Sequence, residues 1–198
     1  KIIKKPKKKK QVLFIGRLVP EKGCHLFVDA IKNIVKNFPD WQFKIIGTPK
    51  AGDNKLSLAY SRKLINSFLS LGKNVEYLGF IPNEQVKKIL ERTSILVVPS
   101  IWQEPFALTA LEGICSGSAV IASNVGGMKE MLEDIGYLIN DIDSVKIEKV
   151  IKKLILNPDL LIKYQNKSWY NYRYNQTDIV ILQDKYRKKI IKKFNLFS

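Results

Sequence analysis

The segment from 99 to 112, PSIWQEPFALTALE, combines residue types that could bind an anion and a pair of hydroxyl groups. Pro105 suits the first turn of a helix, where backbone N–H groups have no partner within the helix, and Thr109 adds a hydroxyl nearby. The N-terminus of a helix stabilises an anion. The segment also carries two carboxylates, Glu104 and Glu112.

Glu112 stands among small and apolar residues, where a carboxylate is costly to bury without a partner. That partner could be a salt bridge or a backbone donor, which would make the residue structural. It could also be paired hydroxyls such as those of a ribose. The spacing alone leaves both interpretations open.

A second segment, GRLVPEKG from 16 to 23, could hold a diphosphate. Its terminal glycines, Gly16 and Gly23, allow a tight turn and a close approach of the backbone to a ligand. Arg17 and Lys22 place two cations in one loop, which suits a diphosphate. The pattern is neither a P-loop nor GxGxxG, and solvated loop charges explain the two cations equally well.

The elements that must position these segments can be predicted from short apolar runs that alternate with helical periodicity. The runs predict strands at 11–15, 41–47, 74–78, 95–98, 119–122 and 136–139, and helical periodicity occurs near 26–35, 64–71, 84–91 and 108–115. The alternation predicts an α/β fold with a doubly wound, mostly parallel six-stranded sheet. Ligands bind beyond the carboxyl ends of such strands, which is where both segments would lie.

The strand signals stop after residue 143. Helical periodicity over 145–156, 159–174 and 178–194 predicts a helical C-terminal tail that spans 143–198.

The formal net charge of +16 is concentrated at the two ends of the chain. Residues 1–10 hold seven lysines and no acidic residue, and we interpret them as a solvated basic linker that precedes one domain at 11–198. A basic total is typical of proteins that bind nucleic acid or anionic membranes. No zinc finger or aromatic RNA-binding motif accompanies it, so no nucleic-acid partner is predicted.

The remaining residues do not indicate a metal site or an oxidising compartment. Cys24 and Cys115 lie far apart, without a CxxC pattern or a cluster of metal ligands. The single histidine, His25, falls at the start of a predicted helix and is interpreted as a surface or capping residue. No apolar stretch approaches the roughly 20 residues of a membrane span, and we expect a cytoplasmic domain.

Taken together, the motifs resemble the retaining GT-B glycosyltransferases of family GT4. Glu104 and Glu112 form the E-x7-E element of that family, and GRLVPEKG resembles its diphosphate loop. LGFIPNEQV, from 78 to 86, resembles its base-binding turn, and GGMKE, from 126 to 130, resembles its glycine pair and following glutamate. These motifs follow the family's order and cover about 11–139.

The resemblance implies that the chain is the C-terminal, Rossmann-like donor-binding half of a GT-B enzyme. Such an enzyme transfers a sugar from a nucleoside-diphosphate sugar, UDP- or GDP-linked, to a saccharide or lipid-linked saccharide acceptor. The resemblance further implies a role in lipopolysaccharide, capsule or exopolysaccharide synthesis, with no cofactor and no metal. An N-terminal domain would supply the acceptor site, so the chain alone is expected to be inactive. A weak contact with the inner face of an anionic membrane is also implied.

The resemblance assigns catalytic roles to Glu104, Arg17 and Lys22: the two cations would neutralise the diphosphate, and Glu104 would contact the transferred sugar. Thr109 and the backbone at 107–108 would bind phosphate, Glu112 the ribose, and the main chain at 80–81 the base. The implied donor-binding residues are Gly16, Phe80, Ile81, Phe106, Ala107, Leu108, Thr109 and Glu112. Ala107 departs from the family, which usually has Gly there.

Three alternatives stay open at this point. A sugar-nucleotide epimerase on the same fold would share the nucleotide site but release a free sugar. A non-catalytic module could bind anions through the basic ends of the chain. A glycosidase that uses Glu104 and Glu112 as its acid and base fits less well, because that chemistry needs no diphosphate loop.

Overall fold

The computed structural model describes residues 5–49 and 55–171. The strands are β1 (Lys9–Ile15), β2 (Gln42–Ile46), β3 (Val75–Gly79), β4 (Thr93–Val98), β5 (Ala119–Ser123) and β6 (Tyr137–Ile139). The helices are α1 (Cys24–Asn37), α2 (Lys55–Leu69), α3 (Asn83–Arg92), α4 (Leu108–Cys115), α5 (Met128–Leu132), α6 (Ser144–Leu156) and α7 (Pro158–Asn171), with a 3-10 turn η1 (Pro20–Lys22). All six predicted strands are present, and the predicted α/β fold class is confirmed.

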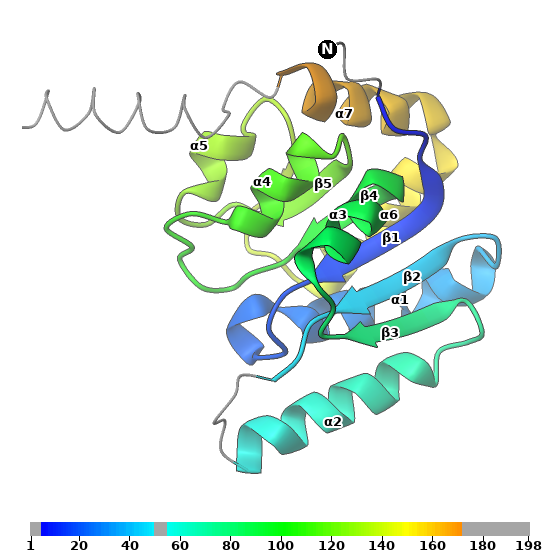
Figure 1. Ribbon diagram of the computed structural model, residues 1–198, viewed down its shortest axis with the longest axis vertical. Helices are drawn as coiled ribbons and strands as arrows, with labels where there is room; N and C mark the ends of the chain where they lie inside the picture. Colours follow the sequence, from blue (N-terminus) through cyan, green and yellow to red (C-terminus); the bar gives the residue numbers. More distant parts are fainter. Residues whose placement is uncertain (1–4, 50–54, 172–198) are drawn as a thin grey trace, which may run out of the picture.

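The six strands form one parallel sheet in the order β3-β2-β1-β4-β5-β6. From β1 the strands are added first toward one edge of the sheet, as β2 and β3, and then toward the other, as β4, β5 and β6. The direction changes between β1 and β4, which are neighbours in the sheet although two strands separate them in the sequence (Figure 1). In doubly wound sheets the crevice at such a switch point is where ligands bind. The segments after β1 and β4 are the two that the sequence marked for chemistry.

The sheet is covered on both faces, which explains why its strands are almost continuously apolar. On one face, Phe14 of β1 packs in a cluster with Ile31 of α1 and Ile151 of α6. On the other face, Leu96 of β4 packs in a cluster with Ile114 of α4 and residues of α3 and α5. Figure 1 shows α3 and α4 in front of the sheet, with α1 and α6 partly hidden behind it.

The described part of the predicted helical tail packs on the domain itself. Helix α6 joins the core beside α1, and α7 lies at the amino ends of the central strands. There the Ser168 hydroxyl donates to the carbonyl of Ser118 at 2.6 Å, and the Gln165 side chain donates to the carbonyl of Ser94 at 3.3 Å. Helix α7 therefore closes the end of the sheet opposite the switch point. The helix predicted at 178–194 lies outside the described residues.

The basic start of the chain is more integrated than the interpretation as a solvated linker implied. Strand β1 already begins at Lys9, and Lys8 is half-buried. The Lys8 ammonium donates to the carbonyls of Ser116 and Leu90, at 2.5 and 3.3 Å, close to the ends of α4 and α3. Burial, together with a smaller contribution from the charge of Lys5 and against that of Glu91, lowers the pKa of Lys8 to about 7. The expectation of a fully solvated lysine run is therefore wrong at Lys8.

Candidate functional site

Two loops meet at the switch point and are held together by backbone contacts. The β1–α1 loop turns at Gly23, whose φ of +68° lies in the left-handed region. A Cβ at this position would stand 1.9 Å from the carbonyl oxygen of Pro99, in the β4–α4 loop, so the close approach requires glycine. Nearby, the N–H of Ile101 donates to the carbonyl of Glu21 at 2.9 Å.

At the centre of this junction, Lys22 and Glu104 form an ion pair between their side chains. Glu104 is buried, and the Ser100 hydroxyl donates to the same carboxylate oxygen at 2.9 Å. A buried carboxylate without partners would be strongly unfavourable, so Lys22 and Ser100 stabilise Glu104 in its position. The sequence marked Lys22 and Glu104 separately, but it indicated neither their contact nor the part played by Ser100. The one available signal for Ser100 is its place at the carboxyl end of β4.

The loop between β5 and α5 binds the backbone carbonyl of Glu104 and the side chain of the residue before it. The N–H of Gly127 donates to the carbonyl of Glu104 at 2.8 Å, and the N–H of Gly126 donates to the side chain of Gln103 at 2.8 Å. Gly126 has a φ of +53°, and a Cβ on it would lie 2.2 Å from the carbonyl oxygen of Glu104. The glycine pair thus has a structural role in holding the Glu104 loop.

A small cavity of about 180 Å³ opens beside the ion pair. Its walls include many of the residues that the resemblance assigned to donor binding: Gly16, Lys22, Glu104, Phe106, Ala107, Leu108 and Thr109. Because the N-cap residue of α4, Ala107, has no capping side chain, the first N–H groups of this helix receive no side-chain acceptor there. The φ of Ala107 is −85°, which any residue adopts, so the departure from glycine introduces no backbone strain.

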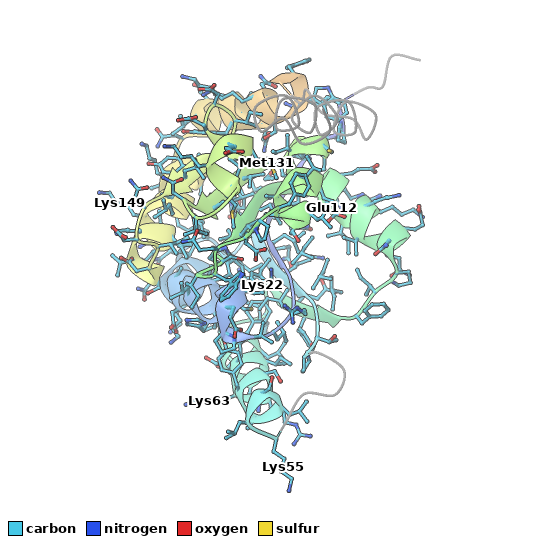
Figure 2. The ribbon with its side chains drawn as sticks, turned by 90° about the vertical axis from the view of Figure 1, so that its left-hand side faces the viewer. Lys22, Lys55, Lys63, Glu112, Met131 and Lys149 are labelled. Atoms are coloured by element: carbon cyan, nitrogen blue, oxygen red, sulfur yellow. The ribbon has the colours of Figure 1, made fainter. Side chains whose placement is uncertain are left out.

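Four predicted site residues lie away from the small cavity. Arg17 is exposed and lines a neighbouring larger cavity, whereas Lys22 lines both. Phe80 and Ile81 follow β3, and Phe80 is 83% exposed. Glu112 lies on α4, apart from Lys22, as Figure 2 shows. Neither cavity is lined by Phe80, Ile81 or Glu112.

The expectation of a buried Glu112 is wrong, because the residue is exposed in this chain. Its local surroundings still remove enough water from the carboxylate to raise the pKa of Glu112, and the charge of Lys87 opposes that shift. Whether Glu112 binds a ribose stays a prediction.

Other features of the described residues bear on metals and membranes. Within 5–49 and 55–171, no group of three or more His, Cys, Asp or Glu side chains is arranged to hold a metal ion. In the same residues, no helix has the length and apolar character needed to cross a bilayer.

His25 bonds through Nδ1 with the hydroxyl of Tyr60 at 2.9 Å.

Comparisons with known proteins agree with this architecture. Residues 1–175 match the family described as "Glycosyl transferases group 1". The chain is 33% identical over 140 residues to spore coat protein SA of Bacillus subtilis (strain 168), covering 70% of the chain but only 37% of that protein. It therefore spans less than half the length of this curated relative.

Solved structures extend the similarity. The C-terminal domain of the group 1 family glycosyl transferase LpcC from Francisella tularensis superposes with a TM-score of 0.68 at 27% identity, covering 82% of this chain and 84% of that one. S. aureus TarM, solved as a mutant with fondaparinux, α-GlcNAc-glycerol and UDP, gives a TM-score of 0.70 at 25% identity, covering 91% of this chain and 36% of that one. The chain belongs to the group 1 family of glycosyl transferases.

Proposed function

We propose that this chain is the donor-binding half of a retaining glycosyltransferase that uses a nucleoside-diphosphate sugar and a saccharide or lipid-linked saccharide acceptor. The observation that carries the proposal is the small cavity at the β1–β4 switch point, where Lys22, Glu104 and the N-terminus of α4 come together. A cation and helix N–H groups that no N-cap side chain accepts from suit a diphosphate, and a carboxylate suits sugar hydroxyls. The UDP and the saccharide ligands of the TarM structure support the same ligand classes.

In the proposed reaction, the bond between the anomeric carbon and the diphosphate oxygen breaks, and an acceptor hydroxyl forms the new glycosidic bond. The electron pair of the broken bond leaves with the diphosphate, which also takes up the acceptor proton. Lys22 and the first N–H groups of α4 stabilise the negative charge that develops on this leaving group. Glu104 accepts hydrogen bonds from the sugar hydroxyls, or stabilises positive charge developing at the anomeric carbon. Because the ammonium of Lys22 has three donors, it can contact the diphosphate while it stays close to Glu104.

The proposal includes charge neutralisation by protein groups instead of a divalent metal. Lys22 and Arg17, which both line the larger cavity, supply positive charge, and α4 supplies its N-terminus. Nucleotide binding should then be unchanged when EDTA is added. A loss of affinity in EDTA, restored by Mg²⁺ or Mn²⁺, would contradict this part of the proposal.

The role of Lys22 can be tested by isothermal titration calorimetry of the chain with UDP, GDP and ADP. A charge-assisted hydrogen bond contributes about 1.5–3 kcal/mol, so Lys22→Met should weaken binding of the preferred nucleotide by roughly 10-fold or more. Lys36→Met, at an exposed position in the last turn of α1, serves as the control and should bind like the unaltered chain. Equal affinities for the unaltered chain and Lys22→Met with every nucleotide would refute the assignment.

Retention and group transfer are tested on the longer, two-domain protein of which we propose this chain to be a part, with a sugar nucleotide of known anomeric configuration. Proton NMR of the product should show the configuration of the donor at the new glycosidic bond. An inverted product would contradict the retaining mechanism. Formation of a free isomerised sugar without an acceptor would indicate an epimerase instead.

We further propose surface polysaccharide as the destination of the sugar, and a weak electrostatic contact with anionic membrane through the lysines at the start of the chain. Lys7, Lys9 and Lys10 are exposed, and each lysine near an anionic surface contributes about 1 kcal/mol. Sedimentation with phosphatidylglycerol vesicles should decrease with added salt and should be absent with phosphatidylcholine alone. Equal sedimentation with both vesicle types would contradict the contact.

A further inference from the structure

Helix α2 carries a concentrated positive charge at one end of the molecule. Residues 55–73, which include α2 and the turn after it, hold four basic residues and no acidic residue. The four are Lys55, Arg62, Lys63 and Lys73, and all of them are exposed. Figure 1 shows α2 as the outermost element beside the edge strand β3, and in Figure 2 Lys55 points away from the domain.

Neighbouring acidic side chains do not neutralise this charge. In the part of the chain that the structure describes, none of the four basic residues forms an ion pair. Helix α2 packs against β3 and α1. The acidic residue of β3, Glu76, is paired with Lys44, and the acidic residue of α1, Asp29, is paired with Lys32. The outer surface of α2 therefore keeps a net positive charge.

Leucine side chains are exposed on the same surface. Leu64 and Phe68 lie on the buried side of α2 and join the core together with residues of α1. Leu56, in contrast, is 81% exposed, and Leu58 and Leu69 are also exposed. The packing of α2 on the domain does not account for these three leucines.

Each exposed leucine shares its side of the helix with a basic residue. Arg62 comes four residues after Leu58 and seven before Leu69, and such spacings bring side chains to the same side of a helix. Lys63 comes seven residues after Leu56, on the other flank. The outer surface of α2 therefore interleaves apolar and cationic side chains along its length.

This combination suits the surface of an anionic lipid bilayer. Leucines on a basic helix enter the boundary between headgroups and acyl chains, and lysine and arginine are attracted to anionic headgroups. A nucleic acid would use the cations but offers no apolar layer to the leucines. A second copy of the chain would bring like charges together.

We infer that the outer surface of α2 is a docking surface for an anionic lipid bilayer. The helix lies along the membrane plane, with its four basic residues at the headgroups and the three leucines inserted to a shallow depth. This surface is separate from the lysines at the start of the chain, because the start of β1 and helix α2 lie toward opposite ends of the molecule (Figure 1). Docking through α2 does not require the proposed function to be correct.

Sedimentation of the 198-residue chain with vesicles tests this surface. The chain should bind vesicles of phosphatidylglycerol and phosphatidylcholine mixed in equal parts, and it should not bind phosphatidylcholine alone. Arg62→Gln combined with Lys63→Gln removes two charges and introduces a residue type that forms helices well. Each basic residue near an anionic surface contributes about 1 kcal/mol, which is about 5-fold in partitioning, so this variant should bind roughly 25-fold more weakly.

Leu56→Gln isolates the apolar contribution without a change in charge. A polar side chain does not enter the apolar layer, so partitioning should fall by about 3-fold or more. Because Leu56 is exposed, this substitution should leave the thermal unfolding of the chain unchanged.

Matched controls remove the same chemical groups from α6 and α7. Lys149→Gln combined with Lys163→Gln lowers the net charge by the same amount, and Leu156→Gln removes an exposed leucine at the end of α6. In Figure 2, Lys149 lies well away from Lys55 and Lys63. Both controls should bind vesicles like the unaltered chain.

Amide hydrogen exchange locates the contact in the unaltered chain. Vesicles that contain phosphatidylglycerol should slow exchange in the first turn of α2, whose N–H groups have no partner within the helix, and should leave α6 unchanged. Protection of α6 or of the start of β1, with none in α2, would overturn the inference.

The remaining outcomes separate this surface from other modes of binding. Equal losses in the double variant of α2 and in its control would show attraction by net charge alone, and the inference would be wrong. It would be equally wrong if Leu56→Gln bound like the unaltered chain, because no leucine would then be inserted. If replacing Lys7, Lys9 and Lys10 by Gln abolished binding while the α2 variants retained it, only the contact through the start of the chain would stand.

Two further measurements keep the alternatives apart. Binding of a DNA duplex through the two cations of the double variant, with no binding to vesicles, would assign the surface to nucleic acid and overturn the inference. Nucleoside diphosphate binding is measured in parallel by calorimetry. Its presence or absence decides the proposed function and leaves the result for α2 unaffected.

Discussion

Glu104 is a buried carboxylate that pairs with the ammonium of one lysine and accepts a hydrogen bond from the hydroxyl of one serine. The sequence could predict the identities of Glu104 and Lys22, because each lies in a recognisable segment. It could not predict their contact, because the two residues are 82 positions apart and meet only through the arrangement of the sheet. It also misjudged Glu112, because apolar neighbours along a helix do not show which face of that helix is covered.

The first prediction concerns the charge of Glu104. Glu104→Gln keeps the shape of the side chain and an acceptor for Ser100, but it leaves Lys22 without its counter-charge. Nucleoside diphosphate affinity, measured by calorimetry, should stay equal or rise, because Lys22 no longer has to be shared. Transfer activity of the longer protein should fall by about 100-fold or more, comparable to the loss of one stabilising group in a transition state.

Glu133→Gln, at an exposed position after α5, is the matched control and should retain both properties. A Glu104→Gln protein with full transfer activity would exclude Glu104 from the reaction.

The second prediction concerns Lys8, whose pKa is lowered by burial to about 7. An unfolded lysine has a pKa of about 10.4, so between about pH 7 and 10 the unfolded chain binds a proton that the folded chain does not. The free energy of unfolding should therefore rise with pH across this interval. Lys5, whose pKa is also lowered by burial, adds to the rise in the same direction.

Lys8→Met should remove most of this rise, as measured by urea unfolding at several pH values. Lys10→Met is the control, because Lys10 is exposed and pairs with Asp40 at the surface. Curves for Lys8→Met and the unaltered chain that run parallel from pH 7 to 10 would contradict the prediction.

At the element scale, three loops at the carboxyl edge of the sheet form the candidate site: β1–α1, β4–α4 and β5–α5. Their contacts depend on glycines, because the backbones approach too closely for a Cβ at Gly23 and Gly126. The sequence predicted the strands and most helices well, since the apolar periodicity is strong there. It missed α5, which is only five residues long, and the first half of α2, where Leu56 and Leu58 are exposed and form no buried stripe.

The third prediction separates backbone strain from contact at Gly126. Gly126→Ala introduces a Cβ 2.2 Å from the carbonyl oxygen of Glu104 at a φ of +53°. Gly79→Ala has a similar φ of +62°, but its Cβ would meet nothing closer than 3.9 Å. Both should lose about 1–3 kcal/mol of stability from the backbone conformation.

Gly126→Ala should lose more stability than Gly79→Ala and, in addition, should weaken nucleotide binding, because the Glu104 loop must move. Thermal unfolding and calorimetry measure the two effects. Identical behaviour of the two variants would show that the glycine pair does not position Glu104.

At the scale of the whole molecule, the strand order explains why residues from two distant segments share one cavity. The alternation of strands and helices predicted a doubly wound sheet, but not the strand order β3-β2-β1-β4-β5-β6. That order depends on how the helices pack against the two faces of the sheet. Helix α7 closes the opposite end of the sheet, so the carboxyl edge is the open one. The aromatic and apolar residues exposed there include Phe80, Ile101, Trp102, Phe106 and Leu108.

The fourth prediction follows from the proposal that this chain is the donor-binding half of a two-domain enzyme. The 198-residue chain covers 37% of its relative from B. subtilis, and we expect it to bind a nucleoside diphosphate without transferring sugar. Transfer should be measurable only in the longer protein, by the release of nucleoside diphosphate that depends on an acceptor. Turnover by the 198-residue chain at a rate equal to that of the longer protein would contradict this expectation.

If the carboxyl edge between β1 and β4 is the donor site, a bound nucleotide should protect backbone amides there, and amide hydrogen exchange measures that protection. The chain is measured with and without whichever of UDP, GDP or ADP binds most tightly in calorimetry. Bound nucleotide should slow exchange in the β1–α1 loop and in the first turn of α4, and should leave exchange in α6 and α7 unchanged. Protection that is confined to α6, α7 or the lysines at the start of the chain, with none at these two segments, would contradict it.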